Sequence, residues 1–187
     1  MHLKSQKGFT LIEIIVVIVI LSIVSAITIK FLVDSLRIYT MTVDQKTLFD
    51  EGKLALERMC RDLRDANSIT APSSGGSSSS GTLLSFTRTH ATAQDSAGDT
   101  IQFILSSATL QRKASTRPTV DLASYVTAIT VTRGTSPNNE ITISFTLSHT
   151  MTGETLSVSL RTNVIPKNFS TDAGLDSGKR SATEGRE

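Results

Sequence analysis

The 187-residue sequence predicts an α+β fold in which one long N-terminal α-helix packs on an antiparallel β-sheet domain. Three observations predict it. An apolar run at residues 14–29 leads into a stretch whose apolar residues recur every three or four positions, which is typical of a helix. After residue 82, apolar and polar residues alternate, which is typical of half-buried strands. A helix of about 60 residues leaves about 100 residues, the common size of one domain.

Six segments of different composition follow one another along the chain. They are a polar stub at residues 1–8, a membrane-spanning helix at 9–29, an amphipathic continuation of that helix at 30–67, a Ser/Gly-rich loop at 70–81, an antiparallel β domain at 82–167 and a flexible tail at 168–187. As a helix, the second segment would be about 32 Å long, which is enough to cross a bilayer. The loop and the tail contain too little apolar surface to form a packed core.

The long helix is predicted from what it lacks as well as from its pattern. No proline lies between Phe9 and Asn67, and Gly52 is the only glycine there. Because glycine in a helix costs about 1 kcal/mol relative to alanine, we expect a weak point or a bend at Gly52. The predicted apolar stripe after the membrane segment consists of Leu32, Leu36, Tyr39, Val43, Leu56, Met59, Cys60 and Leu63.

Polar side chains on this helix allow two interpretations. Hydroxyl groups recur every third residue and either line a helix–helix seam or bond back to the preceding turn; they belong to Ser22, Ser25 and Thr28. Near the end of the helix, opposite charges lie four residues apart in the pairs Glu57–Arg61, Arg58–Asp62 and Arg61–Asp65. Such pairs contribute a few tenths of a kcal/mol each and form either a solvated helix face or an intersubunit contact surface.

The β domain is predicted from short alternating runs. The residues expected on buried strand faces are Leu84, Phe86, Ile101, Phe103, Leu105, Leu110, Tyr125, Ile129 and Val131. The clearest pattern is a β-hairpin in which residues 141–147 pair with residues 156–160 across Thr152-Gly153-Glu154.

The most informative stretch precedes the helix and reads Lys7-Gly8-Phe9-Thr10-Leu11-Ile12-Glu13. Glu13 opens a segment otherwise suited to lipid. A carboxylate inside a membrane costs a few kcal/mol and is usually kept for a function. Residues 1–8 are too short and too polar to provide the apolar core of a secretory signal, so we expect the apolar segment to remain in the mature protein.

This stretch resembles the leader junction of type IV pilins and of the pseudopilins of type II secretion, whose pattern is a basic residue followed by Gly, Phe, Thr, Leu, Ile or Leu, and Glu. The resemblance implies a type IV pilin-like fold, cleavage after Gly8 by a prepilin peptidase, N-methylation of Phe9 and an assembly role for Glu13. Residues 1–8 would be the prepilin leader peptide. The resemblance also implies a single pass through the inner membrane, a C-terminal domain in the periplasm or outside, and other pilin or pseudopilin subunits as partners.

The residue types fit this chemistry. Gly8 has no side chain, so the peptide bond after it is open to a protease. Lys4 and Lys7 favour a cytoplasmic location for the leader. Cleavage exposes an α-amine at Phe9 in an apolar environment, and Glu13 offers the counter-charge on its own helix or on a neighbouring subunit. The competing interpretation is an interfacial Glu13 on an ordinary signal anchor, which leaves Gly8-Phe9 unexplained.

Charge and cysteine content narrow the class of protein. The net charge is +2, and removal of Lys4 and Lys7 from the 19 basic residues leaves basic and acidic side chains balanced at 17 each, so we expect no nucleic acid partner. Cys60 is the only cysteine, although the domain is expected to face an oxidising compartment. Many major pilins close a C-terminal loop with a disulfide, and its absence favours a minor subunit or pseudopilin. The stretch from Leu54 to Ala66 is similar to one in J-type minor pseudopilins and PilW-like minor pilins.

Catalytic and metal-binding motifs are absent from the sequence, so we expect neither an enzyme nor a cofactor or metal ion. His90 and His149 are single residues near strand ends and are expected on the surface. Asp95 and Asp99 flank a loop and are interpreted either as solvated turn carboxylates or as two ligands of a calcium site, for which the sequence offers only an incomplete ligand set. A basic cluster too small to predict DNA binding consists of Arg112, Lys113 and Arg117.

The sequence therefore predicts a minor pilin or pseudopilin, a structural subunit that primes or joins a type IV pilus or a type II secretion pseudopilus after cleavage and N-methylation. The alternative is a membrane-anchored extracytoplasmic adhesin or a ligand- or DNA-binding module. Processing separates the two, because an anchor keeps its leader, whereas a pilin loses eight residues and gains a methyl group.

Overall fold

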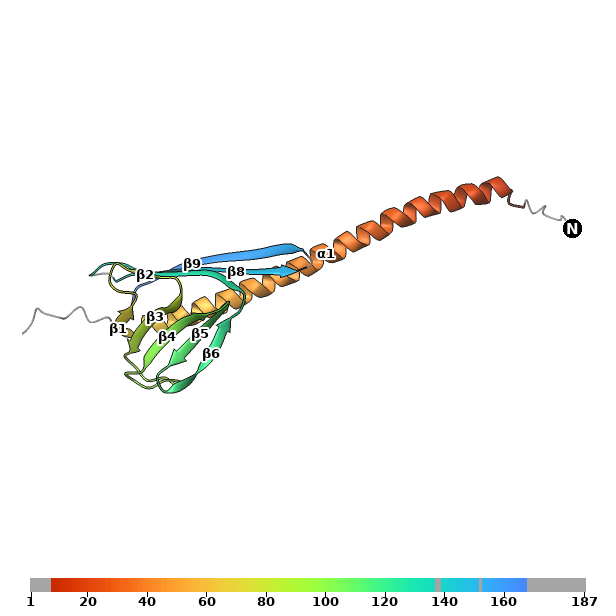
Figure 1. The fold of residues 1–187 in the computed structure, drawn as a ribbon. Helices are drawn as coiled ribbons and strands as arrows, with labels where there is room; N and C mark the ends of the chain where they lie inside the picture. Colours follow the sequence, from red (N-terminus) through yellow and green to blue (C-terminus); the bar gives the residue numbers. More distant parts are fainter. Residues whose placement is uncertain (1–7, 137–138, 152, 168–187) are drawn as a thin grey trace, which may run out of the picture. The chain divides into compact units, whose positions relative to one another are not determined.

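The computed structural model describes residues 8–136, 139–151 and 153–167 (Figure 1). Its elements in chain order are α1 (Leu11–Arg64), β1 (Ala66–Ala71), β2 (Ser77–Ser78), β3 (Gly81–Arg88), β4 (Thr100–Ser106), β5 (Thr109–Ala114), β6 (Arg117–Ala123), β7 (Val126–Arg133), β8 (Ile141–Met151) and β9 (Glu154–Val164). The chain divides into two compact units, residues 1–44 and residues 45–187. The predicted tail at 168–187 and residues 1–7 of the predicted leader lie outside the described residues.

The described part of the first unit is the N-terminal portion of α1 and the short segment before it. The helix begins where the backbone amides of Glu13 and Ile14 donate hydrogen bonds to the carbonyl of Thr10, at 3.1 and 3.3 Å. By length and composition, α1 is the one helix in the described part of the chain that is suited to cross a membrane. The large apolar side chains of this unit are exposed.

The hydroxyl groups of the apolar segment bond back along the helix. Ser22 Oγ donates to the carbonyl of Ile18 at 2.7 Å, and Thr28 Oγ1 donates to the carbonyl of Val24 at 2.8 Å. The local interpretation is therefore confirmed for Ser22 and Thr28, while the helix–helix seam stays a prediction. Each such bond satisfies a polar group that would be costly in a lipid environment.

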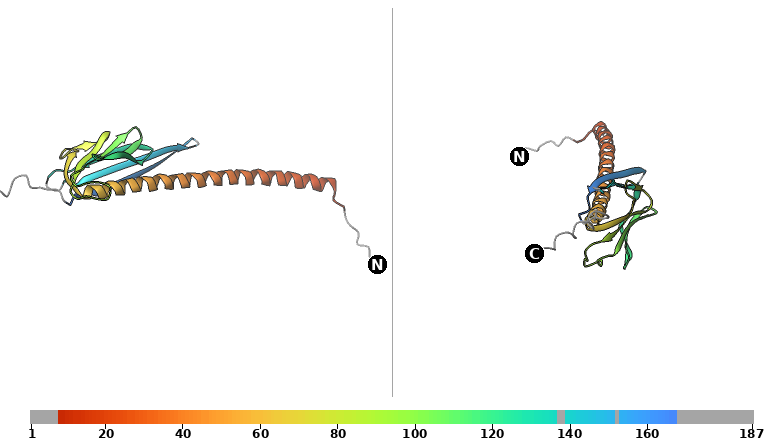
Figure 2. Two further views of the ribbon diagram at one scale, coloured as in Figure 1. Left: turned by 90° about the horizontal axis from the view of Figure 1, so that it is seen from below. Right: turned by 90° about the vertical axis from the view of Figure 1, so that its left-hand side faces the viewer.

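The second unit combines the last turns of α1 with two antiparallel sheets. The five-stranded sheet has the order β1-β3-β4-β5-β6, and the four-stranded sheet has the order β2-β7-β8-β9. In the left view of Figure 2, both sheets lie on one side of this part of the helix. The predicted α+β architecture, with a long N-terminal helix packed on antiparallel sheets, is confirmed.

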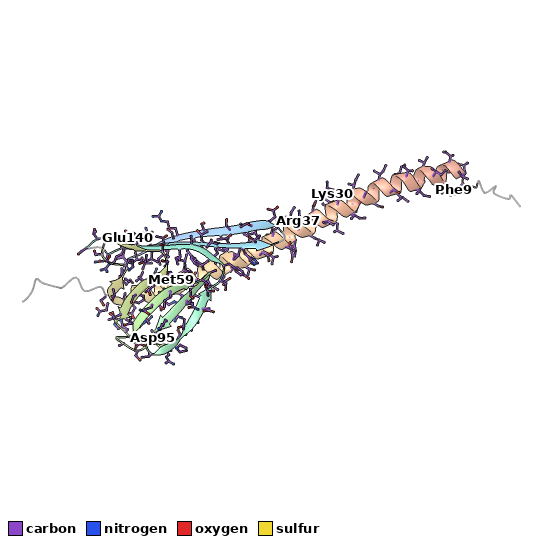
Figure 3. All side chains as sticks on the ribbon, viewed as in Figure 1. Phe9, Lys30, Arg37, Met59, Asp95 and Glu140 are labelled. Atoms are coloured by element: carbon purple, nitrogen blue, oxygen red, sulfur yellow. The ribbon has the colours of Figure 1, made fainter. Side chains whose placement is uncertain are left out.

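The core of the second unit lies where the helix meets both sheets. Met59 and Leu63 of α1 are fully buried, and Met59 is labelled in Figure 3. They belong to one core with Phe86 and Phe103 of the five-stranded sheet and Phe145 of the four-stranded sheet. Full burial of one such side chain contributes about 1.5–3 kcal/mol. The part of the predicted stripe that belongs to this unit therefore packs in the core, with Cys60 half-buried at its edge.

Gly52 allows α1 to approach the four-stranded sheet closely. A Cβ atom at this position would lie 2.7 Å from Leu147 Cδ1 and 3.0 Å from Leu160 Cδ1, which is too close for a carbon contact. α1 continues through this residue and ends twelve positions later, at Arg64. The glycine thus makes room for strand side chains, a role that the expectation of a weak point or bend missed.

The helix ends, and the first strand begins, earlier than the sequence predicts. α1 ends at Arg64 rather than at residue 67, and β1 begins at Ala66, whose side chain is fully buried. The predicted loop at 70–81 contains the end of β1 and the short strand β2, which pairs with β7 opposite Val131 and Thr132. Backbone hydrogen bonds to existing strands do not require apolar side chains, so composition gave no sign of these pairings.

The predicted C-terminal hairpin is confirmed. β8 pairs antiparallel with β9, with Phe145 opposite Leu160 and Leu147 opposite Val158. Gly153 has a φ of +86°, a backbone conformation that glycine adopts at little cost in a tight turn. The register places alternate side chains of both strands on the face that packs against α1.

Two features of the five- and four-stranded sheets differ from the predictions. The alternation pattern does not predict β6, because most of its side chains are exposed. Tyr125, predicted on the buried face with Ile129, is instead 45% exposed and has a φ of +57° just before β7. Val126 takes the buried position, and a register shift between Val126 and Ala128 restores the alternation along β7.

Candidate functional site

The predicted processing and assembly residues lie together at the start of α1. Gly8 and Phe9 precede the helix, and Glu13 lies in its first turn. No atom lies within 4 Å of the position that a Cβ would take at Gly8, and Phe9 is 77% exposed. The peptide bond between these two residues is therefore sterically open.

Glu13 is the only charged residue between Phe9 and Ile29. Its side chain is exposed, and within the described residues it forms no ion pair. A lone carboxylate on an apolar helix is unfavourable in lipid unless another group supplies a positive charge. A positively charged group beside Glu13 would therefore lower the cost of placing this carboxylate in lipid.

A second group of polar residues, the buried ion cluster, is made of Asp62, Arg88, Asp95 and Arg112. Asp62 accepts hydrogen bonds from Arg88 Nη2 and Arg112 Nε, both at 2.7 Å. Arg112 Nη2 donates to Asp95 Oδ2 at 2.5 Å, and Arg88 Nε lies 3.8 Å from the same oxygen. None of the four residues is more than 6% exposed. Two carboxylates thus balance two guanidinium groups, which is how buried charges are tolerated.

The cluster joins three parts of the second unit. Asp62 comes from the last turns of α1, Arg88 and Arg112 come from β3 and β5, and Asp95 comes from the loop between β3 and β4 (Figure 3). Burial by itself would lower the pKa of Arg112, but the hydrogen bonds to Asp95 and Asp62 outweigh it and raise that pKa above its ordinary value. The arrangement fixes the sheet and the loop to the end of the helix.

The cluster corrects several predictions about charged residues. Asp62 is not on a solvated helix face; its predicted pair with Arg58 is present at 3.3 Å, but its main partners come from the sheet. Arg112 is buried rather than part of a surface basic cluster. Asp95 is 4% exposed and bound to Arg112, so it is neither a solvated loop carboxylate nor open to a cation.

A sequence signal for the cluster did exist. Arg88 follows Phe86 by two positions, and Arg112 follows Leu110 by two, so each arginine lies on the same strand face as a fully buried residue. A charged residue at a buried position of the alternation predicts a buried partner of opposite sign. The signal identifies the two arginines, but it does not identify which carboxylates they meet.

Asp99 closes the turn that follows the loop. Its carboxylate accepts hydrogen bonds from the hydroxyl of Thr116 at 2.7 Å, the backbone amide of Ser96 at 2.8 Å and the hydroxyl of Ser115 at 3.1 Å. These bonds, that from Thr116 first, hold its pKa below the ordinary value. In the part of the chain that the structure describes, no group of three or more His, Cys, Asp or Glu side chains is placed to hold a metal ion.

The two histidines have different surroundings. His90 is exposed, as predicted, and its Nδ1 lies 2.6 Å from Asp65 Oδ1 while its backbone amide donates to Asp65 Oδ2 at 3.2 Å. Burial tends to raise the pKa of Asp65, but the hydrogen bonds from His90 outweigh it and leave that pKa below its ordinary value. His149 is half-buried and packs against Tyr125, with ring centroids 4.1 Å apart.

An apolar N-terminal helix that leads into a small α+β domain is consistent with a membrane-anchored pilin. The family model for the prokaryotic N-terminal methylation motif matches residues 3–29. This match supports the type IV pilin and pseudopilin family, and with it a type IV pilin-like protein that prepilin peptidase processes. It favours a structural subunit over an enzyme. No curated protein and no solved structure matches the chain.

Proposed function

We propose that this protein is a minor pilin or pseudopilin that primes or joins a type IV pilus or a type II secretion pseudopilus. The observation that supports this best is the position of the Gly8–Phe9 junction, directly before an apolar helix whose only charged residue up to Ile29 is Glu13. Its partners are prepilin peptidase and sibling subunits. It resides in the inner membrane with a single span, and residues 45–167 lie in the periplasm or outside.

Processing creates the second charge of the pair. Hydrolysis of the Gly8–Phe9 bond leaves a carboxylate on the leader and an amine on Phe9, and methylation of that amine retains its positive charge. Phe9 and Glu13 are four residues apart, close to one helical turn, so the pair can form within one helix or between neighbouring helices. In lipid, either pairing removes much of the cost of both charges, and pairing between subunits favours assembly.

Two features of the chain favour a minor subunit. Cys60 is the only cysteine, and it is a free, half-buried thiol, so no disulfide closes a C-terminal loop. The segment from Leu54 to Ala66 is similar to the corresponding stretch of J-type minor pseudopilins and PilW-like minor pilins. A subunit of this kind sits among few copies of itself and binds different siblings.

Intact-mass measurement of the membrane-extracted protein tests the processing step. The mature protein should lack residues 1–8 and carry one additional methyl group on Phe9. In Gly8→Val the branched side chain should block the peptidase, so the full-length precursor should accumulate, whereas the matched change Ala26→Val should be processed normally. A wild-type protein that keeps its leader would favour the membrane-anchored binding module instead.

Co-purification with filament subunits tests Glu13. Glu13→Val should improve the compatibility of the helix with lipid by about 2–3 kcal/mol. The variant should therefore be cleaved and stable in the membrane but fail to co-purify with siblings, while Glu13→Asp should retain partial incorporation. Normal incorporation of Glu13→Val would remove the proposed assembly role without affecting the processing result.

A further inference from the structure

The last turns of α1 and the strand β9 enclose a groove of about 500 Å³ in the second unit. It is distinct from the buried ion cluster and contains none of its four residues. The lining residues are Lys53, Leu56, Glu57, Cys60, Arg61, Arg64, Leu160, Arg161 and Thr162.

The rim of the groove is strongly basic. Four of its residues are basic and one, Glu57, is acidic, and Glu57 lies 4.0 Å from Lys53. Arg61, Arg64 and Arg161 are exposed, and none of them forms an ion pair with a carboxylate in residues 8–136, 139–151 or 153–167. Elsewhere in this unit, both arginines of the buried ion cluster donate hydrogen bonds to carboxylates. Three uncommitted guanidinium groups around one groove are complementary to an anionic partner.

The floor of the groove is less polar than its rim. Leu160, Cys60 and Thr162 are half-buried, and Cys60 Sγ lies 3.9 Å from Thr162 Oγ1. Leu56 is 8% exposed and completes the floor. Burial of aliphatic side chains against this floor is favourable, and a polyphosphate or sulfate ligand has no aliphatic carbon to bury.

The groove borders a sheet edge. β9 is the outer strand of the four-stranded sheet, and in the described part of the chain it pairs with β8 alone, along eleven residues. The backbone groups on its other edge are therefore available to another strand. Leu160 and Thr162 face the helix, while Arg161 projects from the opposite face of the same strand.

We propose that the groove and the outer edge of β9 together bind an acidic polypeptide segment of another protein, which adds to the four-stranded sheet as an extended strand. Side chains on the helix-facing side of that strand meet Arg61 and Arg64, and those on the other side meet Arg161. Main-chain hydrogen bonds supply affinity, and the basic rim selects acidic sequences. This binding mode depends on residues 53–64 and 154–164 only, and therefore not on cleavage or on Glu13.

A direct test measures binding of a fluorescent peptide, in which pairs of Glu alternate with pairs of Val so that both faces of the extended strand carry glutamates, to the full-length protein in detergent micelles. We expect saturable binding that weakens with added salt. Arg61→Glu, Arg64→Glu and Arg161→Glu should each weaken binding about tenfold or more, because a like charge now faces the peptide. Lys113→Glu carries the same charge change on the exposed face of β5, outside the groove, and should leave binding unchanged.

Two further probes separate strand addition from general attraction of anions. The same peptide with N-methyl groups on every backbone amide has no N–H group on either edge to donate to β9 and should lose binding. Polyphosphate and a single-stranded oligonucleotide have the charge but no peptide backbone and should bind weakly. Equal binding of the N-methylated peptide or of the polyanions would overturn the proposal in favour of a polyanion site. Binding that appears only after residues 168–187 are removed would overturn it in favour of the chain's own C-terminal segment. All variants should show wild-type circular dichroism.

Discussion

Replacement of Asp62 by Asn should strongly destabilise the second unit. Asp62 is 2% exposed and accepts two hydrogen bonds of 2.7 Å from Arg88 and Arg112. Asn keeps the shape but removes the charge. The two buried guanidinium groups, which do not lose their protons, are then left with Asp95 and with the more distant Asp65, whose Oδ2 lies 3.8 Å from Arg88 Nη1. Removing one partner of a buried charge pair costs about 3–5 kcal/mol. For a domain of this size, that loss lowers the melting temperature by about 10–20 °C.

The assay is urea or thermal unfolding of the full-length protein in detergent, followed by circular dichroism of the sheets. Glu57→Gln is a matched control, because it removes the same charge five residues earlier on α1. Its side chain is 55% exposed and its pair with Lys53 is long, so the control should change stability by less than about 0.5 kcal/mol. If Asp62→Asn were no more destabilising than Glu57→Gln, the cluster would not hold the helix to the sheet as we infer.

Two further predictions concern packing and pH. Gly52→Val should destabilise the domain by about 1–3 kcal/mol, because the new side chain collides with Leu147 and Leu160. The control Lys53→Val, at the exposed neighbouring position, should have little effect. Equal stabilities of the two variants in urea would contradict the close approach of α1 to the sheet at Gly52. The pKa of Asp65 in the folded protein is lower than its ordinary value of 3.8. Ionised Asp65 therefore adds to the free energy of unfolding, fully above pH 3.8, and this addition is lost as the pH falls through the pKa of the folded state. Asp65→Asn should therefore be less stable than the wild type at neutral pH and equal to it in strong acid, and a stability gap that persists in strong acid would rule out this linkage.

The elements with a strong periodic pattern could be predicted from the sequence. Phe145 and Leu160 face each other because the spacing of apolar residues on both sides of Gly153 leaves one register that buries them. The helix is likewise evident from the apolar stripe that ends at Leu63. By contrast, β2 and β6 carry few buried side chains, so only their hydrogen bonds to neighbouring strands define them. Those hydrogen bonds depend on where the neighbouring strands lie in space, and a local sequence pattern does not give that position.

The N-terminal candidate site could be predicted because all of its residues lie in one short stretch, with Gly8, Phe9 and Glu13 on both sides of the helix start. The buried ion cluster could not, because its residues come from four separate places in the chain. Asp62 shows why: its spacing from Arg58 satisfies the helical rule, and that local pair conceals two stronger partners from the sheet. Local rules give the pairs that a helix allows, and tertiary structure decides which pairs dominate.

The close packing of Gly52 against Leu147 and Leu160 has a consequence for biosynthesis. The helix is synthesised first and the β8–β9 hairpin that covers it is synthesised last, so these contacts connect the first and the last parts of the domain to leave the ribosome. Folds dominated by such distant contacts form slowly, because the intervening chain must be ordered before they can form. Until β8 and β9 have left the ribosome, the apolar side chains of α1 can contact the five-stranded sheet but lack the four-stranded sheet that completes their burial. The emerging helix therefore keeps part of its apolar surface exposed until synthesis of the hairpin is complete.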